Sequence, residues 1–579
     1  MPAVAATSST SGYVAVLSSQ KSRMDALKAF ADLQQKYGDV LSSKTPDVQE
    51  ANLGDKGIWY RAVVGPPVSR DDASGICSQL KAAGYAGCWV TAYWLPAPSP
   101  SIEQGRDRFE QTPPNPVKSV SSEPVSTFSI DVDTAAYAFA RRALYAGRLP
   151  QKDAVRPEEM INYFPYGYPL PEDRTAPFRP TVTVLPSPWN PSNKLVHIGI
   201  KGYDIAQTER PRTNLVLLID TSGSMAPDNR LPLLKNAFRM FVDTLLPSDT
   251  VGIVTYAGQA QVALEPTKIA EKHKIVDAID RLQAGGSTAG AAGIQQAYRM
   301  AEAGFDRAAV NRVVLATDGD FNVGVTSQAE LKGFIERKRE TGIYLSILGV
   351  GYDNYNDALM QALAQNGNGV AAYIDTLNEA RKVLVDEALS SLFPIAKDVK
   401  LQVEFNPAQV AEYRLIGYET RLLRREDFSN DKVDAGDIGS GHAVTAIYEI
   451  TPVDGPKIVD DLRYARPAAA PVAAMPDGKG AEYAFLKIRY KLPNEETSHL
   501  IDLPITRAVE KSAIGEASTD VRFSIAVAAF AQLLRGEPHL KSFGYDEVVA
   551  LATGAKGDDP FSYRAEFVTL ARLAKTARP

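Results

Sequence analysis

Residues 214–225 read NLVLLIDTSGSM, an apolar run followed at once by an aspartate and two serines. An apolar run without alternation is typical of a parallel strand that is covered on both faces. Asp220, Ser222 and Ser224 therefore follow the carboxyl end of a buried strand, the edge at which open α/β sheets bind ligands. Hard oxygen donors at alternate positions on that edge predict a cation site.

Two more loops carry oxygen donors at the ends of predicted elements. Gly285–Thr288 (GGST) precedes a helical pattern, and Ala316–Gly319 (ATDG) closes another apolar run. We expect Thr288 and Asp318 to join the first loop at one cation. Two carboxylates and three hydroxyls suit Mg²⁺, with Mn²⁺ or Ca²⁺ as alternatives. They leave one coordination position for an Asp or Glu carboxylate of a protein partner.

DTSGSM, GGST and TDG, in this order, resemble the metal-ion-dependent adhesion site of von Willebrand factor type A domains. The resemblance implies that Asp220, Ser222 and Ser224 bind the metal from the first loop. It implies that Thr288 is a ligand in the open, ligand-bound form, and that Asp318 acts directly or through water. The alternative is a vestigial site that is retained for loop capping.

Strand and helix patterns alternate over 212–394, which predicts a doubly wound α/β domain with a parallel sheet. Strand-rich segments at 128–211 and 395–579 flank it, and the second ends in helices. Half a sandwich cannot bury its own face, so we predict one β-sandwich into which the α/β domain is inserted. FSIDVDTAAYAFARRAL (128–144), RPEEMINYFPY (156–166) and the C-terminal region resemble a bacterial family of envelope von Willebrand A proteins. That family has its own N-terminal flank and a C-terminal domain of unknown function.

Residues 11–94 predict a small α+β unit with the order βαββαβ. YVAVLSSQ (13–20), WYR (59–61), Gly65-Pro66 and the two cysteines resemble the SPOR (sporulation-related repeat) domain. The resemblance implies binding to peptidoglycan glycan strands through Tyr13, Ser19, Trp59, Tyr60 and Arg61. The family often carries Gln where this chain has Val16. Neighbours on a strand face opposite ways, so Trp59 or Tyr60 can instead belong to the core.

Other small α/β folds share this element order. An RNA-recognition fold is disfavoured because the unit lacks an RNP1-like run and a basic excess, so no nucleic-acid partner is expected. An unrelated small domain stays open. Residues 95–127 are rich in Pro and Ser and predict a linker.

The chain has two cysteines, Cys77 and Cys88. They are either two buried thiols or a disulfide. A bridge is favoured because Cys77 lies on the apolar face of a predicted helix and Cys88 opens the strand that should cover it. A disulfide would place the protein in an oxidising compartment.

The composition is that of a globular protein of 579 residues with a net charge of −6. No apolar run is long enough for a transmembrane helix. The first residues, MPAVAATSSTSG, are not a signal peptide, and read either as a tail left beside a cleavage site or as a plain N-terminus. The possible disulfide and the SPOR resemblance together predict a location in the periplasm or cell envelope.

These patterns predict a non-enzymatic adhesion or scaffold protein of the envelope. The five histidines are scattered, and no GxSxG or catalytic cysteine pattern occurs, which disfavours a zinc enzyme or a cell-wall hydrolase. A scaffold that works with an AAA+ ATPase is the other alternative. The chain itself has no GxxxxGK[ST] motif.

Overall fold

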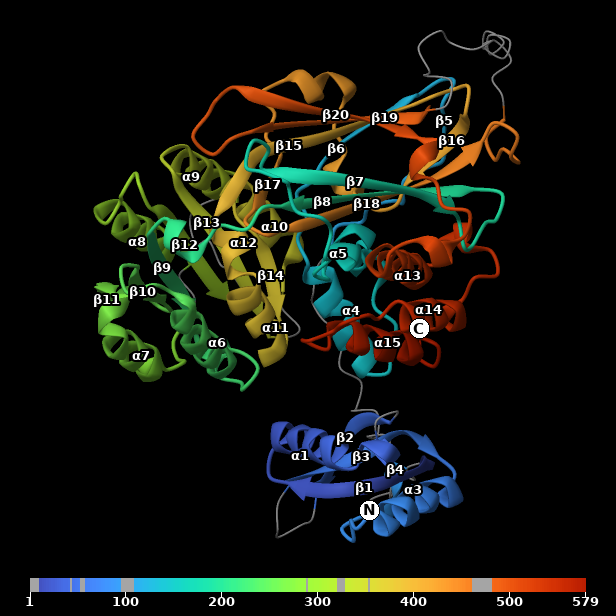
Figure 1. Cartoon of the computed structure of the whole chain (residues 1–579). Helices are drawn as coiled ribbons and strands as arrows, with labels where there is room; N and C mark the ends of the chain where they lie inside the picture. The colour runs from blue at the N-terminus through green and yellow to red at the C-terminus, as the bar shows by residue number, and fades with distance from the viewer. Residues whose placement is uncertain are drawn as a thin grey trace, which may run out of the picture. The chain divides into compact units, whose positions relative to one another are not determined.

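The computed structural model describes residues 10–41, 44–52, 58–94, 109–287, 290–319, 328–351, 355–460 and 482–578. The chain divides into two compact units, Met1–Gln104 and Gly105–Pro579 (Figure 1). Each unit is described by itself.

The N-terminal unit has the predicted βαββαβ order. Its elements are β1 (Thr10–Gln20), α1 (Arg23–Lys36), the short α2 (Gly38–Leu41), β2 (Thr45–Asn52), β3 (Ile58–Val68), α3 (Arg70–Ala82) and β4 (Trp89–Trp94). The four strands form an antiparallel sheet in the order β2-β3-β1-β4. Ser69 caps α3 by accepting a hydrogen bond from the Asp72 amide at 3.1 Å. A disulfide joins Cys77 of α3 to Cys88 beside β4, with the Cα atoms 5.3 Å apart.

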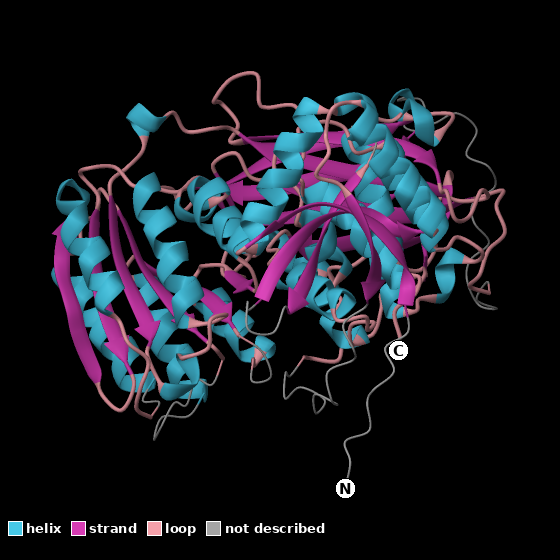
Figure 2. Ribbon diagram, turned by 90° about the horizontal axis from the view of Figure 1, so that it is seen from below, coloured by secondary structure: helices cyan, strands magenta, loops and turns pink. Residues whose placement is uncertain are grey.

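The second unit contains a six-stranded sheet in the order β11-β10-β9-β12-β13-β14. Every neighbouring pair is parallel except β10 and β11. Helices cover both faces (Figure 2, left), and a separate apolar core fills each face. The strands are β9 (Thr213–Asp220), β10 (Thr250–Tyr256), β11 (Ala260–Lys268), β12 (Val310–Thr317), β13 (Ile343–Val350) and β14 (Ala371–Ile374). This confirms the predicted doubly wound α/β domain.

The helices of this α/β domain are α6 (Leu231–Thr244), α7 (Lys272–Arg281), α8 (Gly290–Ala303), α9 (Gln328–Glu340), α10 (Asp357–Asn366), α11 (Leu377–Arg381) and α12 (Ala388–Leu392). A π-helical turn at Lys382–Asp386 separates α11 from α12.

Two further sheets stack as a β-sandwich (Figure 1). One has the order β17-β15-β19-β20, with β6 paired to β15, and the other has the order β5-β16-β18-β8-β7. Strands from before the α/β domain are β5 (Lys118–Ser119), β6 (Val125–Ser129), β7 (Phe178–Pro186) and β8 (Lys194–Gly202). Strands from after it are β15 (Pro394–Phe405), β16 (Val410–Leu415), β17 (Gly436–Gly439), β18 (Ala443–Pro452), β19 (Glu482–Lys491) and β20 (Ser498–Thr506). Each sheet mixes both flanks, so the predicted insertion of the α/β domain is confirmed.

The sandwich also corrects the predicted linker over 95–127. Lys118 and Ser119 pair with β16, and Val120 is 2% exposed in the sandwich core. The ring of Phe109 packs edge-on against Phe139 at 5.0 Å between centroids. The sequence pattern did not predict this packing, because the few apolar residues involved stand apart in a stretch rich in Pro and Ser. The remainder of the predicted linker, up to residue 108, lies outside the described residues.

A helical layer packs beside the sandwich. It comprises α4 (Ala135–Tyr145), α5 (Pro157–Asn162), α13 (Thr519–Arg535), α14 (Tyr545–Gly554) and α15 (Tyr563–Ala574), which share one core. The buried Arg141 of α4 pairs with Asp375 and Glu379 of the α/β domain and with Glu566 of α15. This ion-pair network joins both flanks to the inserted domain.

The α/β domain approaches the sandwich at glycines. A Cβ atom on Gly439 of β17 would lie 1.6 Å from the Ser390 carbonyl oxygen of α12. Within the flanks themselves, a Cβ atom on Gly436 would lie 2.3 Å from the Asp131 nitrogen, which follows β6. Backbones can approach this closely only where no side chain intervenes.

Candidate functional site

The first predicted metal loop follows β9 directly. The Ser222 amide donates to Asp220 Oδ1 at 2.9 Å, and the hydroxyls of Ser222 and Ser224 lie 3.0 Å apart. Asp220 and Ser222 are buried, whereas Ser224 is partly exposed. The loop therefore presents a carboxylate and two hydroxyls from one turn of chain, with Ser224 nearest to solvent.

The second loop is bonded to the first through the backbone. The Gly285 amide donates to the Thr221 carbonyl at 2.8 Å, and the Gly223 amide donates to the Gly286 carbonyl at 3.0 Å. Gly286 has a φ of +88°, a conformation that favours glycine. Thr288 itself lies outside the described residues, so its ligand role stays a prediction.

The third loop follows β12 and meets the first from its other side. The Thr317 hydroxyl donates to Asp220 Oδ2 at 3.3 Å, and Asp318 is buried beside it. The Arg230 guanidinium pairs with Asp318 and also donates to the Ser224 carbonyl at 2.8 Å. The structure thus brings together four of the five predicted metal residues, Asp220, Ser222, Ser224 and Asp318.

Sequence reasoning missed Arg230 and Thr317. Thr317 directly precedes Asp318 at a strand end, so its position was a usable signal. Arg230 immediately precedes α6, and its closeness to Asp220 in the sequence was a weaker signal. Gly351 provides its space, because a Cβ atom there would lie 2.3 Å from Arg230 Nε.

The electrostatics of this centre favour a cation. Burial raises the pKa of the Asp220 carboxyl, and the nearby Asp318 carboxylate raises it further. A bound divalent ion would stabilise the ionised form of Asp220, because its positive charge offsets both the loss of solvation and the repulsion from Asp318. Carboxylate and hydroxyl oxygens are also the donors that Mg²⁺ prefers. The residues present therefore fit the predicted metal.

The predicted glycan residues do not share one face of the N-terminal sheet. Tyr60 packs against the core under the helices, and the Tyr13 ring lies 5.8 Å from the Arg70 guanidinium at the start of α3. By strand alternation from Tyr60, Trp59 and Arg61 face the opposite side, and the Lys21 ammonium lies 4.0 Å above the Trp59 ring. Ser19 pairs with Arg61 across β1 and β3 and so shares that face.

The face opposite the helices is curved. Gln49 of β2 donates to the Ala92 carbonyl of β4 at 3.2 Å, although two strands lie between them in the sheet. Val14, Val16 and Val63 are buried as a separate small cluster. Val16, the position at which the SPOR family often carries Gln, therefore lies inside this apolar cluster rather than at the surface.

Family models match most of the chain. They are the SPOR domain at residues 9–92, "von Willebrand factor" at 103–197, the von Willebrand factor type A domain at 214–386 and "Uncharacterized protein YfbK, C-terminal" at 390–577. A SPOR domain indicates association with the cell envelope. No helix among the described residues is long and apolar enough to cross a membrane.

Individual proteins resemble different shares of the chain. Uncharacterized protein YfbK of Escherichia coli is 45% identical over 81% of this chain and 81% of its own length. Uncharacterized protein sll0103 of Synechocystis is 28% identical over 33% of this chain and 44% of its own length. A von Willebrand factor type A structure from Catenulispora acidiphila aligns at 16% identity over 68% of this chain and 89% of that chain, with a TM-score of 0.38.

Proposed function

Because the chain belongs to the YfbK family of von Willebrand A proteins and carries an N-terminal SPOR domain, we propose that it is a non-enzymatic scaffold of the bacterial periplasm. Its metal centre binds Mg²⁺ and captures an Asp or Glu carboxylate of a protein partner. Its SPOR domain binds peptidoglycan glycan strands, which holds the captured partner at the cell wall.

The observation that carries the metal-bridge proposal is the convergence of Asp220, Ser222, Ser224 and Asp318 beside Arg230. Arg230 neutralises one of the two carboxylates. A bound divalent ion would then keep a net positive charge, since only one carboxylate remains to offset it. That charge attracts a third carboxylate, and the partly exposed Ser224 marks the side from which it enters.

Ligation rather than hydrolysis is supported by the groups present. The described residues of the centre offer carboxylates, hydroxyls and one guanidinium, and no histidine or lysine as a general base. The bound ion would supply an electrostatic bridge, and the protein side chains would orient it.

The test of the metal bridge is capture from envelope extract on immobilised full-length protein. We expect one or more proteins to be retained with Mg²⁺ and released by EDTA. The variant Asp220→Ala should retain none, whereas Asp228→Ala, which removes an exposed aspartate of the same loop, should behave as the wild type. Capture that survives EDTA would refute the bridge.

The test of wall attachment is sedimentation with sacculi. Full-length protein should pellet with sacculi whose stem peptides have been removed by an amidase, and less with untreated sacculi. Trp59→Ala should weaken this binding, and Tyr60→Phe should not, since Tyr60 packs in the core. Equal sedimentation with both kinds of sacculi would argue against glycan recognition.

A further inference from the structure

A cavity of about 400 Å³ lies where the α/β domain meets the sandwich. Its floor is the face of β12, β13 and β14 that looks toward α6, and its rim includes β17 and the segment before it. The apolar part of the lining includes Phe241, Val314, Leu348, Leu384 and Leu392. This volume is within the range of small-molecule binding sites. We call this space the junction cavity.

Arg312 lines the junction cavity near the amino end of β12. Asp318 lies six positions further along the extended chain, so Arg312 lies roughly 20 Å from the predicted metal site. Arg312 therefore lies away from the predicted metal site and from Arg230.

Arg312 is a buried cation without a carboxylate partner. The residue is 3% exposed, and its guanidinium donates to the Ser346 hydroxyl at 2.6 Å. Among the described residues, no carboxylate lies within 4 Å of it, and its Nε has no hydrogen-bond partner. Burial lowers the pKa of this guanidinium to about 10. Buried charges are ordinarily paired, whereas this guanidinium has the Ser346 hydroxyl and, at 5.6 Å, the Tyr344 ring beside it, and the charge of Asp437 acts on it only from beyond 4 Å.

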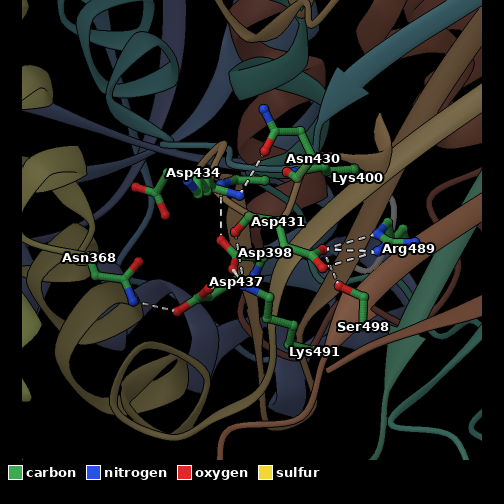
Figure 3. Close-up of polar contacts among 12 residues, drawn as sticks. Asn368, Asp398, Lys400, Asn430, Asp431, Asp434, Asp437, Arg489, Lys491 and Ser498 are labelled. Carbon is green, nitrogen blue, oxygen red and sulfur yellow. Dashed lines mark hydrogen bonds and ion pairs between the residues drawn. The ribbon is translucent and has the colours of Figure 1, made fainter. Parts of the chain in front are cut away.

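Asp437 lines the same cavity from the sandwich side, within an acidic group drawn in Figure 3. Its acidic neighbours have cations: Asp398 pairs with Lys491 at 2.8 Å, Asp434 with Arg339, and Asp431 with Arg489 at 3.0 Å. Within the described part of the chain, Asp437 has no lysine or arginine within 4 Å. Burial and the Asp398 and Asp434 carboxylates raise the pKa of Asp437 to about 7.

Two residues in a left-handed backbone conformation donate hydrogen bonds to Asp437. The Asn368 amide donates to it at 2.9 Å (Figure 3), and the Asp398 backbone amide donates at 3.3 Å. Both partners have a φ of 52°, a left-handed conformation that costs free energy in a residue other than glycine.

Arg312 and Asp437 are held by one short segment. Asn368 bonds Asp437, and two residues further on the Val370 amide donates to Ser346, the partner of Arg312, at 3.5 Å. Arg312 and Asp437 also line the same cavity, so a cation and an acid that have no oppositely charged residue within 4 Å in the described part of the chain face one partly apolar space.

We propose that the junction cavity binds a small zwitterion of the amino-acid class, whose carboxylate bonds Arg312 and whose ammonium group bonds Asp437. The apolar floor receives the side chain of this ligand. Binding would place an anion beside the buried Arg312 and a cation beside the partly buried Asp437, neither of which has an oppositely charged residue within 4 Å among the described residues.

The test begins with thermal unfolding of the full-length protein in the presence of each common amino acid and of dialanine. At least one should raise the melting temperature, and calorimetric titration then gives its affinity. The deaminated analogue and the amide of that ligand should each bind at least about tenfold more weakly, because each loses one charge-assisted contact. No shift with any compound, or an analogue that binds as tightly, would overturn the proposal.

Two variants separate a ligand site from a structural role. Arg312→Met and Asp437→Asn should abolish the ligand-induced shift, and Arg337→Met and Asp502→Asn, which change exposed residues, should preserve it. Without ligand, Arg312→Met should melt no lower than the wild type, because it removes an unpaired buried charge. A lower melting temperature of that variant would show that Arg312 serves stability, and would overturn the proposal.

Discussion

Replacing Asp220 by asparagine tests the metal centre most directly. Asparagine is nearly isosteric, and its carbonyl can still accept the Ser222 amide that Asp220 accepts at 2.9 Å. The Thr317 hydroxyl, now 3.3 Å from Oδ2, can rotate to accept from the new amide. Because burial and Asp318 raise the pKa of Asp220, the neutral side chain also removes repulsion. The variant should therefore fold and melt no lower than the wild type without metal.

The effect appears when Mg²⁺ is added. A ligand at a hundred times its dissociation constant stabilises the folded state by about 2.7 kcal/mol. The compact unit that holds the site has about 475 residues, for which the unfolding entropy is roughly 1 kcal/mol per degree. The wild type should thus melt about 3 °C higher with Mg²⁺, and Asp220→Asn should not shift.

Differential scanning calorimetry with Mg²⁺ or EDTA measures this difference. Asp228→Asn, an exposed substitution in the same loop, is the control and should shift like the wild type. An equal Mg²⁺ shift in Asp220→Asn would refute the assignment of Asp220 as a metal ligand.

Three further predictions concern stability. Replacing Cys77 and Cys88 by serine should lower the free energy of unfolding of the N-terminal unit by about 3 kcal/mol, because the disulfide closes a loop of eleven residues. Amide hydrogen exchange in α3 and β4 should become about 100-fold faster. Unchanged exchange would contradict this prediction. Gly439→Ala should cost about 1–3 kcal/mol, since its Cβ atom would overlap a carbonyl of α12, whereas Gly515→Ala has open space and should be nearly neutral in urea unfolding. The pKa of Asp437 is raised to about 7 in the folded protein, so its neutral form contributes stability below pH 4 that is lost as the pH rises through 7. Asp437→Asn should therefore leave the free energy of unfolding unchanged at pH 4. At pH 8 it should raise that free energy by up to about 4 kcal/mol, less where solvent screens the group.

The sequence by itself determined the α/β domain, its insertion and most of the loop residues that we propose as metal ligands. The apolar run before Asp220 is local information, since burial on both faces requires unbroken apolar residues. Parallel strands then place Asp220 and Asp318 at one edge, whatever the loops between them. The flanks were predictable as one sandwich because neither half could bury its own face. The same local pattern placed Cys77 on the apolar side of α3.

Only the tertiary structure decided which charges are paired. Arg230 meets Asp318, and Arg312 has no carboxylate within 4 Å among the residues that the structure describes. Both outcomes depend on how distant elements pack, and neither is visible in the neighbouring sequence. Similarly, the curvature of the N-terminal sheet buried Val16, and the pairing of Lys118 with β16 made part of the expected linker a strand. Side-chain alternation and helix periodicity act over a few residues. The pairing of a buried charge depends on groups brought together from hundreds of residues apart.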